Sequence, residues 1–361
     1  MENYREVELL TQKTLGDSGT ETIDINVDEP ITELSVRFYV RNDSAAADEV
    51  PPESCVSKIE IVDGGTVYSS LNGREATAMA WYDKGRWPAH WYSSQANEGS
   101  RVEWPFQFGR FLGDPEYAFS PTRLLNPQLK FTWAKNALHL ADSCKLDVNA
   151  KVMQGVSAPG QALMTKVIRS WTGSAAATVE VDLPTDYPYR RLYFGEYLAE
   201  TTFANMITNA KLECDVGKLV VFDMDDEQLM NLMERLWGLA EYADLPCLSN
   251  NESYMSHLGF VRTFLATMWT ADRVISACPT NIPYVAVYTR DLAGGAVNDQ
   301  KVSVRVQGLC PELTYCYPFG RQDDPATWFR SSKYGSVKLK ITEAGGATAA
   351  SVFVQQPRPL P

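Results

Sequence analysis

The sequence has little histidine and no motif that marks a common catalytic or metal site. Its 361 residues include three histidines, His90, His139 and His257, and none stands in an HExxH or other paired spacing. Neither a GxSxG nucleophile turn nor a P-loop occurs. An isolated histidine is typical of a surface or satisfied core position. The sequence therefore predicts no catalytic residue and no cofactor.

Long apolar segments are also missing. No run reaches the roughly 18 apolar residues that a membrane-spanning helix needs. The first eight residues are polar and acidic, and no apolar signal segment follows them. We therefore expect neither a transmembrane helix nor a signal peptide.

Paired cysteines and excess positive charge are absent as well. The seven cysteines are scattered without a CxxC pair, which is typical of buried free thiols in a chain of this length. The formal net charge is −12, which argues against a protein that mainly binds nucleic acid phosphates. We expect folding in a reducing cytoplasm and no specific nucleic-acid partner.

What the chain does contain is alternation. Short segments alternate polar and apolar residues and are separated by Gly, Pro, Asn and Asp, as in residues 22–27, 34–40, 129–133, 302–306 and 337–341. A period of two places one face inward and one outward, as in antiparallel sheets. Aromatic residues make up 11% of the chain, which also favours strands. Many such strands predict a sandwich or barrel.

Two segments have helical spacing instead, namely residues 72–82 and 225 to about 243. Each starts with a capping box, in which an N-cap side chain and the residue three positions later satisfy each other's backbone amides. The two capping pairs are Asn72 with Glu75 and Asp225 with Gln228. Gly85 is suited to end the first helix.

These helices lie in matching contexts, which indicates an internal duplication. A shift of 153 residues places Lys58 on Lys211 and one helix cap on the other. A shift of 156 places residues 23–27 over 179–183, and a shift of 184 places Pro127 on Pro311. The second copy would then carry about 31 extra residues between Gly238 and Cys310. Two unrelated β-rich domains, or one large sandwich, remain alternatives.

The predicted fold class is therefore all-β, with two tandem eight-stranded jelly-roll β-sandwiches and short helices in strand connections. The predicted domains are residues 1–160 for the first jelly roll and 161–361 for the second, with an insertion around 238–310. The Pro-rich end, residues 355–361, predicts an extended tail that leaves the fold.

Three segments carry a resemblance to a known family: VSKIEIVDGG (56–65), SLNGRE (70–75) and NPQLKFTW (126–133). The strand, glycine turn and short helix, together with the later strand, resemble the double jelly-roll major capsid proteins. This lineage includes tailless icosahedral bacteriophages with an internal membrane and adenovirus-like shells. The layout covers nearly the whole chain, so the resemblance is architectural.

The resemblance implies a structural protein without enzymatic activity. It implies a homotrimer with a pseudo-hexagonal outline, which as a capsomer tiles an icosahedral shell. The implied partners are neighbouring capsomers, penton and minor capsid proteins and an internal membrane. The implied location is the virion, with assembly in the host cytoplasm.

An acidic run, residues 223–227, has two interpretations. Hard cations prefer several carboxylate oxygens, so Asp223, Asp225 and Asp226 are candidate metal ligands. The favoured interpretation is a helix N-terminus, where the helix dipole favours negative charge.

Aromatic residues gather between residues 81 and 104 around Gly85 and Pro88. They predict either a subunit interface or the filling of a sandwich core. The candidate interface residues are Trp81, Trp87, Trp91, Tyr92 and Trp104.

Two other functions are considered. A secreted-type hydrolase on paired jelly rolls would use carboxylates near these aromatics, with Glu98, Glu103 and Asp114 as candidates for acid–base work. A glycan-binding or receptor-binding protein would use the aromatics themselves. The missing signal segment argues against the first, and the lack of a fibrous repeat argues against a receptor-binding spike.

Overall fold

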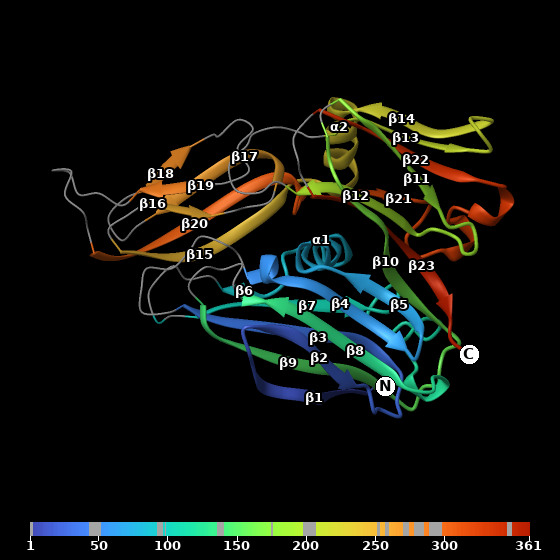
Figure 1. Cartoon of the computed structure of the whole chain (residues 1–361), viewed down its shortest axis with the longest axis horizontal. Coiled ribbons are helices and arrows are strands. Elements are labelled where there is room, and N and C mark those ends of the chain that lie inside the picture. The colour runs from blue at the N-terminus through green and yellow to red at the C-terminus, as the bar shows by residue number, and fades with distance from the viewer. Residues whose placement is uncertain are drawn as a thin grey trace.

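The computed structural model describes residues 3–42, 52–91, 97, 99–135, 141–174, 176–197, 207–250, 253–256, 260–269, 274–277, 285–288, 298–344 and 349–361. Within these residues strands dominate and there are two α-helices, which confirms the predicted all-β class (Figure 1). None of the described helices has the length and apolarity that crossing a membrane requires.

The first half of the chain forms eight strands of one sandwich. They are β1 (Asn3–Leu15), β2 (Ser18–Asp24), β3 (Ile31–Asn42), β4 (Val56–Asp63), β5 (Thr66–Leu71), β7 (Gly99–Gln107), β8 (Pro127–Ala134) and β9 (Ala141–Gln154). One sheet has the order β1-β9-β3-β7 and the other β2-β8-β4-β5, and β6 (His90–Trp91) extends the first sheet beyond β7. These orders define a jelly roll.

The second half repeats the plan. Its strands are β10 (Gln161–Thr172), β11 (Thr178–Leu183), β12 (Arg191–Tyr197), β13 (Ile207–Cys214), β14 (Leu219–Asp225), β21 (Thr314–Pro318), β22 (Val337–Glu343) and β23 (Ala349–Pro359). The sheets run β10-β23-β12-β21 and β11-β22-β13-β14. Counted by rank within each half, both halves have the orders 1-8-3-6 and 2-7-4-5. The predicted duplication and double jelly roll are thus confirmed.

The alternation in sequence explains the cores. In β3, Leu34, Val36 and Phe38 are fully buried, whereas the residues between them are only half-buried. In β22, Val337, Leu339 and Ile341 fill the second core in the same way. The two halves are joined by a parallel contact of β5 with β10, through Ser70 and Lys166, which makes one sheet continuous across the molecule.

Both predicted helices form between the fifth and sixth strands of their jelly rolls. α1 (Gly73–Lys84) begins with the capping box of Asn72 and Glu75, and it ends at Gly85 with φ +65°. α2 (Asp226–Trp237) begins with the equivalent box at Asp225. The predicted extension of the second helix to about residue 243 is wrong. The chain leaves the helix at Gly238, whose φ of +71° is unfavourable for other residues, and enters a strand at Ala240.

The strand pairing corrects the residue correspondence between the halves. Leu129 of β8 pairs with Ile23 of β2, and Leu339 of β22 pairs with Val181 of β11. The isolated β-bridges give the same correspondence. Ile31 pairs with Phe119 in the first half as Tyr189 pairs with Phe329 in the second, and Ile31 and Tyr189 are again 158 residues apart. Ile23 therefore corresponds to Val181, 158 residues later, and the predicted shift of 156 is wrong by two.

The β4–β5 hairpin shows a similar error. Ile61 pairs with Leu129 as Leu212 pairs with Leu339, so β4 corresponds to β13 with a shift of 151 and not 153. Both hairpins have a register shift directly after this residue. The turn then has two residues in the first half (64–65) and four in the second (215–218), which restores the shift of 153 at the helix caps.

The match of Pro127 with Pro311 was also wrong, because β8 holds the place of β22 and not of β21. The insertion is consequently about twice as long as predicted. The first half joins α1 to β7 through residues 85–98, whereas the second half joins α2 to β21 through residues 238–313.

The insertion forms strands of its own. They are β15 (Ala240–Asn250), β16 (Ser253–Ser256), β17 (Phe260–Trp269), β18 (Val274–Ala277), β19 (Val285–Tyr288) and β20 (Asn298–Pro311). They build the sheets β15-β20-β17-β18 and β16-β19, which project beside both jelly rolls at the upper left of Figure 1.

The predicted C-terminal tail does not leave the fold. β23 continues to Pro359 and lies between β10 and β12, with Gln355 and Gln356 buried. β12 pairs with β23 only as far as Gln355. Pro357 and Pro359 therefore lie where β23 pairs with β10 alone, and a proline that has no amide hydrogen to donate is tolerated there.

Candidate functional site

Two of the predicted interface residues are core residues. Trp104 is fully buried in the first jelly roll, and its indole Nε1 donates a 2.8 Å hydrogen bond to Thr77 Oγ1 of α1. Trp81 is 3% exposed and stacks edge-on against Tyr82. The interface interpretation is therefore wrong for both, because their side chains are buried by the sandwich core and by the packing of α1.

The other three aromatics differ from one another. Trp87 is partly buried and makes an edge-to-face contact with Phe260 of the insertion, 5.8 Å between ring centroids. Trp91, in β6, is 44% exposed. Tyr92 lies outside the described residues. Trp91 thus remains a candidate for contact with another molecule.

The acidic run caps a helix. Asp225 accepts a hydrogen bond from the backbone amide of Gln228, and Asp226 lies in the first helical turn. Asp223 lies beside Asn209 and Lys211 on the neighbouring strand. Among the described residues no cluster of three or more His, Cys, Asp or Glu side chains has a metal-binding arrangement. The helix N-terminus interpretation is confirmed for this segment.

Two of the three candidate hydrolase carboxylates, Glu103 and Asp114, are already paired. Glu103 accepts hydrogen bonds from Ser35 and Arg37, and although burial raises its pKa, these bonds hold the pKa below the ordinary value. Asp114 is fully buried, and Arg110 holds its pKa low in the same way, 2.7 Å from Nε to Oδ2. A general acid needs a raised pKa, so neither residue is suited to that role. Glu98 lies outside the described residues.

His139 and His257 also lie outside the described residues. His90 Nδ1 lies 2.7 Å from the carbonyl oxygen of Pro88, and burial lowers the pKa of its imidazole. The described cysteines Cys55, Cys144, Cys214, Cys310 and Cys316 are buried free thiols. Burial raises the pKa of each of these thiols, and it raises that of Cys316 to about 12. None of these thiols is poised as a nucleophile.

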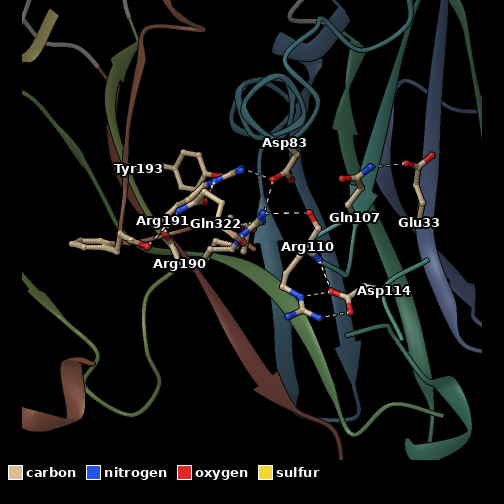
Figure 2. Close-up of polar contacts among 12 residues, drawn as sticks. Glu33, Asp83, Gln107, Arg110, Asp114, Arg190, Arg191, Tyr193 and Gln322 are labelled. Atoms are coloured by element: carbon tan, nitrogen blue, oxygen red, sulfur yellow. Dashed lines mark hydrogen bonds and ion pairs between the residues drawn. The ribbon is translucent and has the colours of Figure 1, made fainter. Parts of the chain in front are cut away.

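One buried polar cluster among the described residues was not predicted from sequence. At the junction of the two jelly rolls, Asp83 at the end of α1 accepts a hydrogen bond from Arg191 and lies 3.5 Å from Nη1 of Arg190 (Figure 2). The Asp83 side chain is 3% exposed. Burial, with the neighbouring Arg191, lowers the pKa of Arg190 to about 10. Two arginines against one buried carboxylate form a strong and directional contact.

Glutamines and a loop complete this cluster. Arg190 donates to the side chain of Gln355, 2.8 Å, and Arg191 donates to that of Gln322, 2.7 Å. Arg110 of the first half, held by Asp114, donates to the backbone carbonyl of Asp323 in the second. The network therefore ties a loop of each half to the strand start of β12.

An aromatic cluster lies beside these charges. Tyr82 of α1 packs edge-on against Trp237 of α2 and Tyr193 of β12, at centroid distances of 5.0 and 5.9 Å. Its hydroxyl donates to the carbonyl oxygen of Thr314, 2.6 Å away. Arg191 lies over the Trp237 ring, 5.1 Å from its centroid. The junction therefore contains oriented polar contacts within an apolar core, which fixes how the halves are placed.

Little in the sequence signals this junction. Arg190 and Arg191 form the only adjacent arginine pair in the sequence, directly before an alternating strand, but adjacent charges are common at strand ends. Asp83 belongs to a helix whose other buried residues are largely apolar. Only the packing of α1 against the second sheet brings them together.

No family model matches the chain, and no curated protein is similar to its sequence. Solved structures do match. The major capsid protein of Sulfolobus turreted icosahedral virus aligns with a TM-score of 0.61 at 11% identity, over 99% of this chain and 97% of that one. A PBCV-1 virus capsid chain gives 0.60 at 11% identity, covering 99% and 94%.

The major capsid protein P2 of bacteriophage PM2 gives a TM-score of 0.55 at 12% identity, covering 99% of this chain and 98% of that one. At such low identity the likeness shows the fold alone. It extends over nearly the full length of each of these three chains. The suspected resemblance is thus confirmed at the level of architecture: this chain has the double jelly-roll fold of major capsid proteins.

Proposed function

We propose that this chain is the major capsid subunit of a virus, and that it trimerises into pseudo-hexagonal capsomers that tile an icosahedral shell. The observation that carries the proposal is the repetition of one jelly roll twice, in a fold that matches major capsid proteins over 99% of the chain. Two similar halves per chain give a trimer six similar lobes, and six lobes pack a flat lattice.

The chemistry of the described residues supports a structural role without enzymatic activity. Glu103 and Asp114 have lowered pKa values and the described thiols have raised ones, so these groups rest in unreactive states. The buried cluster of Asp83, Arg190 and Arg191 joins the two halves. Such contacts stiffen a building block.

The proposed location is the virion, after assembly in the host cytoplasm. The proposed partners are further copies of the chain, neighbouring capsomers, penton and minor capsid proteins and an internal membrane. The exposed Trp91 is a proposed contact residue, since tryptophan often anchors protein interfaces. Trp87 and Tyr92 keep this role only as a prediction.

The mass of the purified full-length protein tests the proposal. Light scattering coupled to size exclusion is expected to give three times the chain mass of 40.3 kDa, and negative-stain images should show hexagonal particles or shells. A monomer that persists across a wide concentration range would contradict the proposal.

A further inference from the structure

The two helices occupy equivalent places but have different surroundings. α1 is buried on nearly every side, because it lies between its own jelly roll and the outer face of the sheet that contains β12, β21 and β23 (Figure 1). The residues of α2 that correspond to the buried Glu75, Ala78 and Trp81 of α1 are exposed; they are Gln228, Asn231 and Glu234. Half of α2 therefore lacks the partner that α1 has.

The helix ends confirm this equivalence. Gly85 and Gly238 end α1 and α2 at a shift of 153. The residue before each glycine contacts the start of the third strand of its own jelly roll. Lys84 forms a 2.7 Å ion pair with Glu33, and Trp237 lies against Arg191. Glu33 and Arg191 differ by 158 residues, the shift that the strand pairing gives for this strand.

The surface that accepts α1 also has an equivalent. On the second half, α1 covers Tyr193, Cys316 and Phe353, which are fully buried. The strand pairs place Ser35, Pro105 and Asn149 at these positions of the first half. Ser35 and Asn149 on this face are polar and half-buried, whereas Pro105 on β7 is buried. The end of α1 reaches the edge of the face through the ion pair of Lys84 with Glu33.

We propose that α2 of one copy docks on this outer face of β3, β7 and β9 of the next copy, repeating between chains the contact that α1 makes within the chain. This inference rests on the proposed trimer, for which it names the contact surfaces. A contact that uses two different surfaces repeats head to tail, and it closes into a ring when the rotation permits. Each jelly roll in the ring would then contact the next one through the same helix-on-sheet packing, within a chain and between chains.

Charge complementarity supports the docking. Within the chain, Tyr82 donates a hydrogen bond to the carbonyl of Thr314. The equivalent of Tyr82 on α2 is Arg235, which is exposed, and the equivalent of Thr314 on β7 is Glu103. The docking therefore brings a second cation to a carboxylate that already pairs with Arg37 within its own chain. Opposite charges at such a contact favour both association and correct register.

The exposed tryptophan lies on the same face. Trp91 of β6 pairs directly with Arg101 of β7, and Arg101 is two residues from Glu103 on the same strand. Residues directly opposite, or two apart on a strand, share a face of the sheet. Trp91 thus extends the proposed surface with an aromatic side chain that is 44% exposed.

Paired cysteines test the docking in the full-length protein. The double variant Arg235→Cys with Glu103→Cys, treated with a short bismaleimide crosslinker, is expected to give covalently linked chains on a denaturing gel. Each single variant provides the matched control and is expected to give none. The described native cysteines are buried and do not compete.

Charge reversal provides the second measurement. Arg235→Glu is expected to raise the trimer dissociation constant about tenfold or more, whereas Lys218→Glu, on an exposed turn of the same half, changes the charge equally and leaves it unchanged. A trimeric wild type whose double cysteine variant does not crosslink, and whose Arg235→Glu variant stays trimeric, overturns the docking and leaves the proposed function intact. A monomeric wild type overturns the proposed function itself.

Discussion

α1 and α2 hold the same place in two copies of one fold, yet one is a core helix and the other a surface helix. Nine of the twelve residues of α1 are buried, against four of twelve in α2. A helix that is buried all round needs small and apolar residues on every face, whereas a surface helix needs one apolar stripe. The two sequences differ in this way, so duplication preserved the capping and changed the faces.

The outer faces of the two equivalent sheets differ in the same way as the helices. The outer face on β12, β21 and β23 contains aromatic residues and one charge cluster, and it is closed by α1. The equivalent face on β3, β7 and β9 contains charged and amide side chains, with Arg37 and Glu103 paired across it. The face that α1 covers within the chain is thus largely apolar, and the equivalent face on β3, β7 and β9 is more polar.

The aromatic cluster of the first half offers the largest effect. Trp104→Ala removes a fully buried side chain and is expected to cost about 3–5 kcal/mol of unfolding free energy. Trp91→Ala, on the exposed edge strand, is expected to cost about 0.5 kcal/mol or less. Urea unfolding of both variants measures the difference. Similar costs for the two tryptophans would contradict the assignment of Trp104 to the core and Trp91 to the surface.

The junction cluster offers the next effect. Asp83→Asn leaves two buried arginines without a carboxylate and is expected to cost about 3 kcal/mol. At the equivalent position of α2, Leu236→Ala is expected to cost about 1 kcal/mol or less, because Leu236 is 42% exposed. Thermal unfolding at a fixed low protein concentration compares the two. A small loss for Asp83→Asn would mean that the cluster does not hold the halves together.

Glu312, before β21, is expected to make the stability of the protein depend on pH. Burial and the nearby Glu53 raise its pKa from 4.5 to about 8, while Arg74 acts in the opposite direction. Between these values the folded state binds the proton more tightly than the unfolded state, so stability falls as pH rises from about 4.5 to 8. One group contributes at most about 1.4 kcal/mol per pH unit.

Melting temperatures measured from pH 5 to pH 8.5 check this dependence. Glu312→Gln is expected to flatten the decline seen in the wild type. Glu213→Gln serves as the control, because lysines hold the pKa of Glu213 low and it stays ionised over this range. A decline that persists unchanged in Glu312→Gln would assign it to another group.

The two caps give the smallest contrast. Asp225→Ala is expected to cost about 1 kcal/mol, the usual value for an N-cap. Asn72→Ala is expected to cost about 2 kcal/mol, because its partner Glu75 is buried and loses its place in the box. Helix content by circular dichroism, followed during urea unfolding, separates the two. Equal costs would show that burial adds nothing to this cap.

Much of the fold could be predicted from the sequence, and the errors in matching strands between the two halves have one physical origin. Side chains in a strand repeat every two residues, so a slip of two leaves every residue on its face. For this reason the predicted shift of 156, and that of 153 within β4, are each wrong by two, whereas 153 holds at the helix caps. Strands that alternate alike also allowed β8 to be matched with β21 in place of β22.

Of the candidate site, the sequence identified Trp91 but grouped it with Trp81 and Trp104, since composition does not tell which face a tryptophan occupies. It missed Asp83, Arg190 and Arg191 because the partners lie more than a hundred residues apart.

The sequence by itself determined the period of the strands, the capped helices and the repetition of a single plan. These features are local: they depend on alternation, capping geometry and order along the chain. The tertiary structure decided the strand register, the path of the C-terminal strand and the burial of α1. These depend on hydrogen-bond ladders and on packing between distant segments, which alternation alone does not specify.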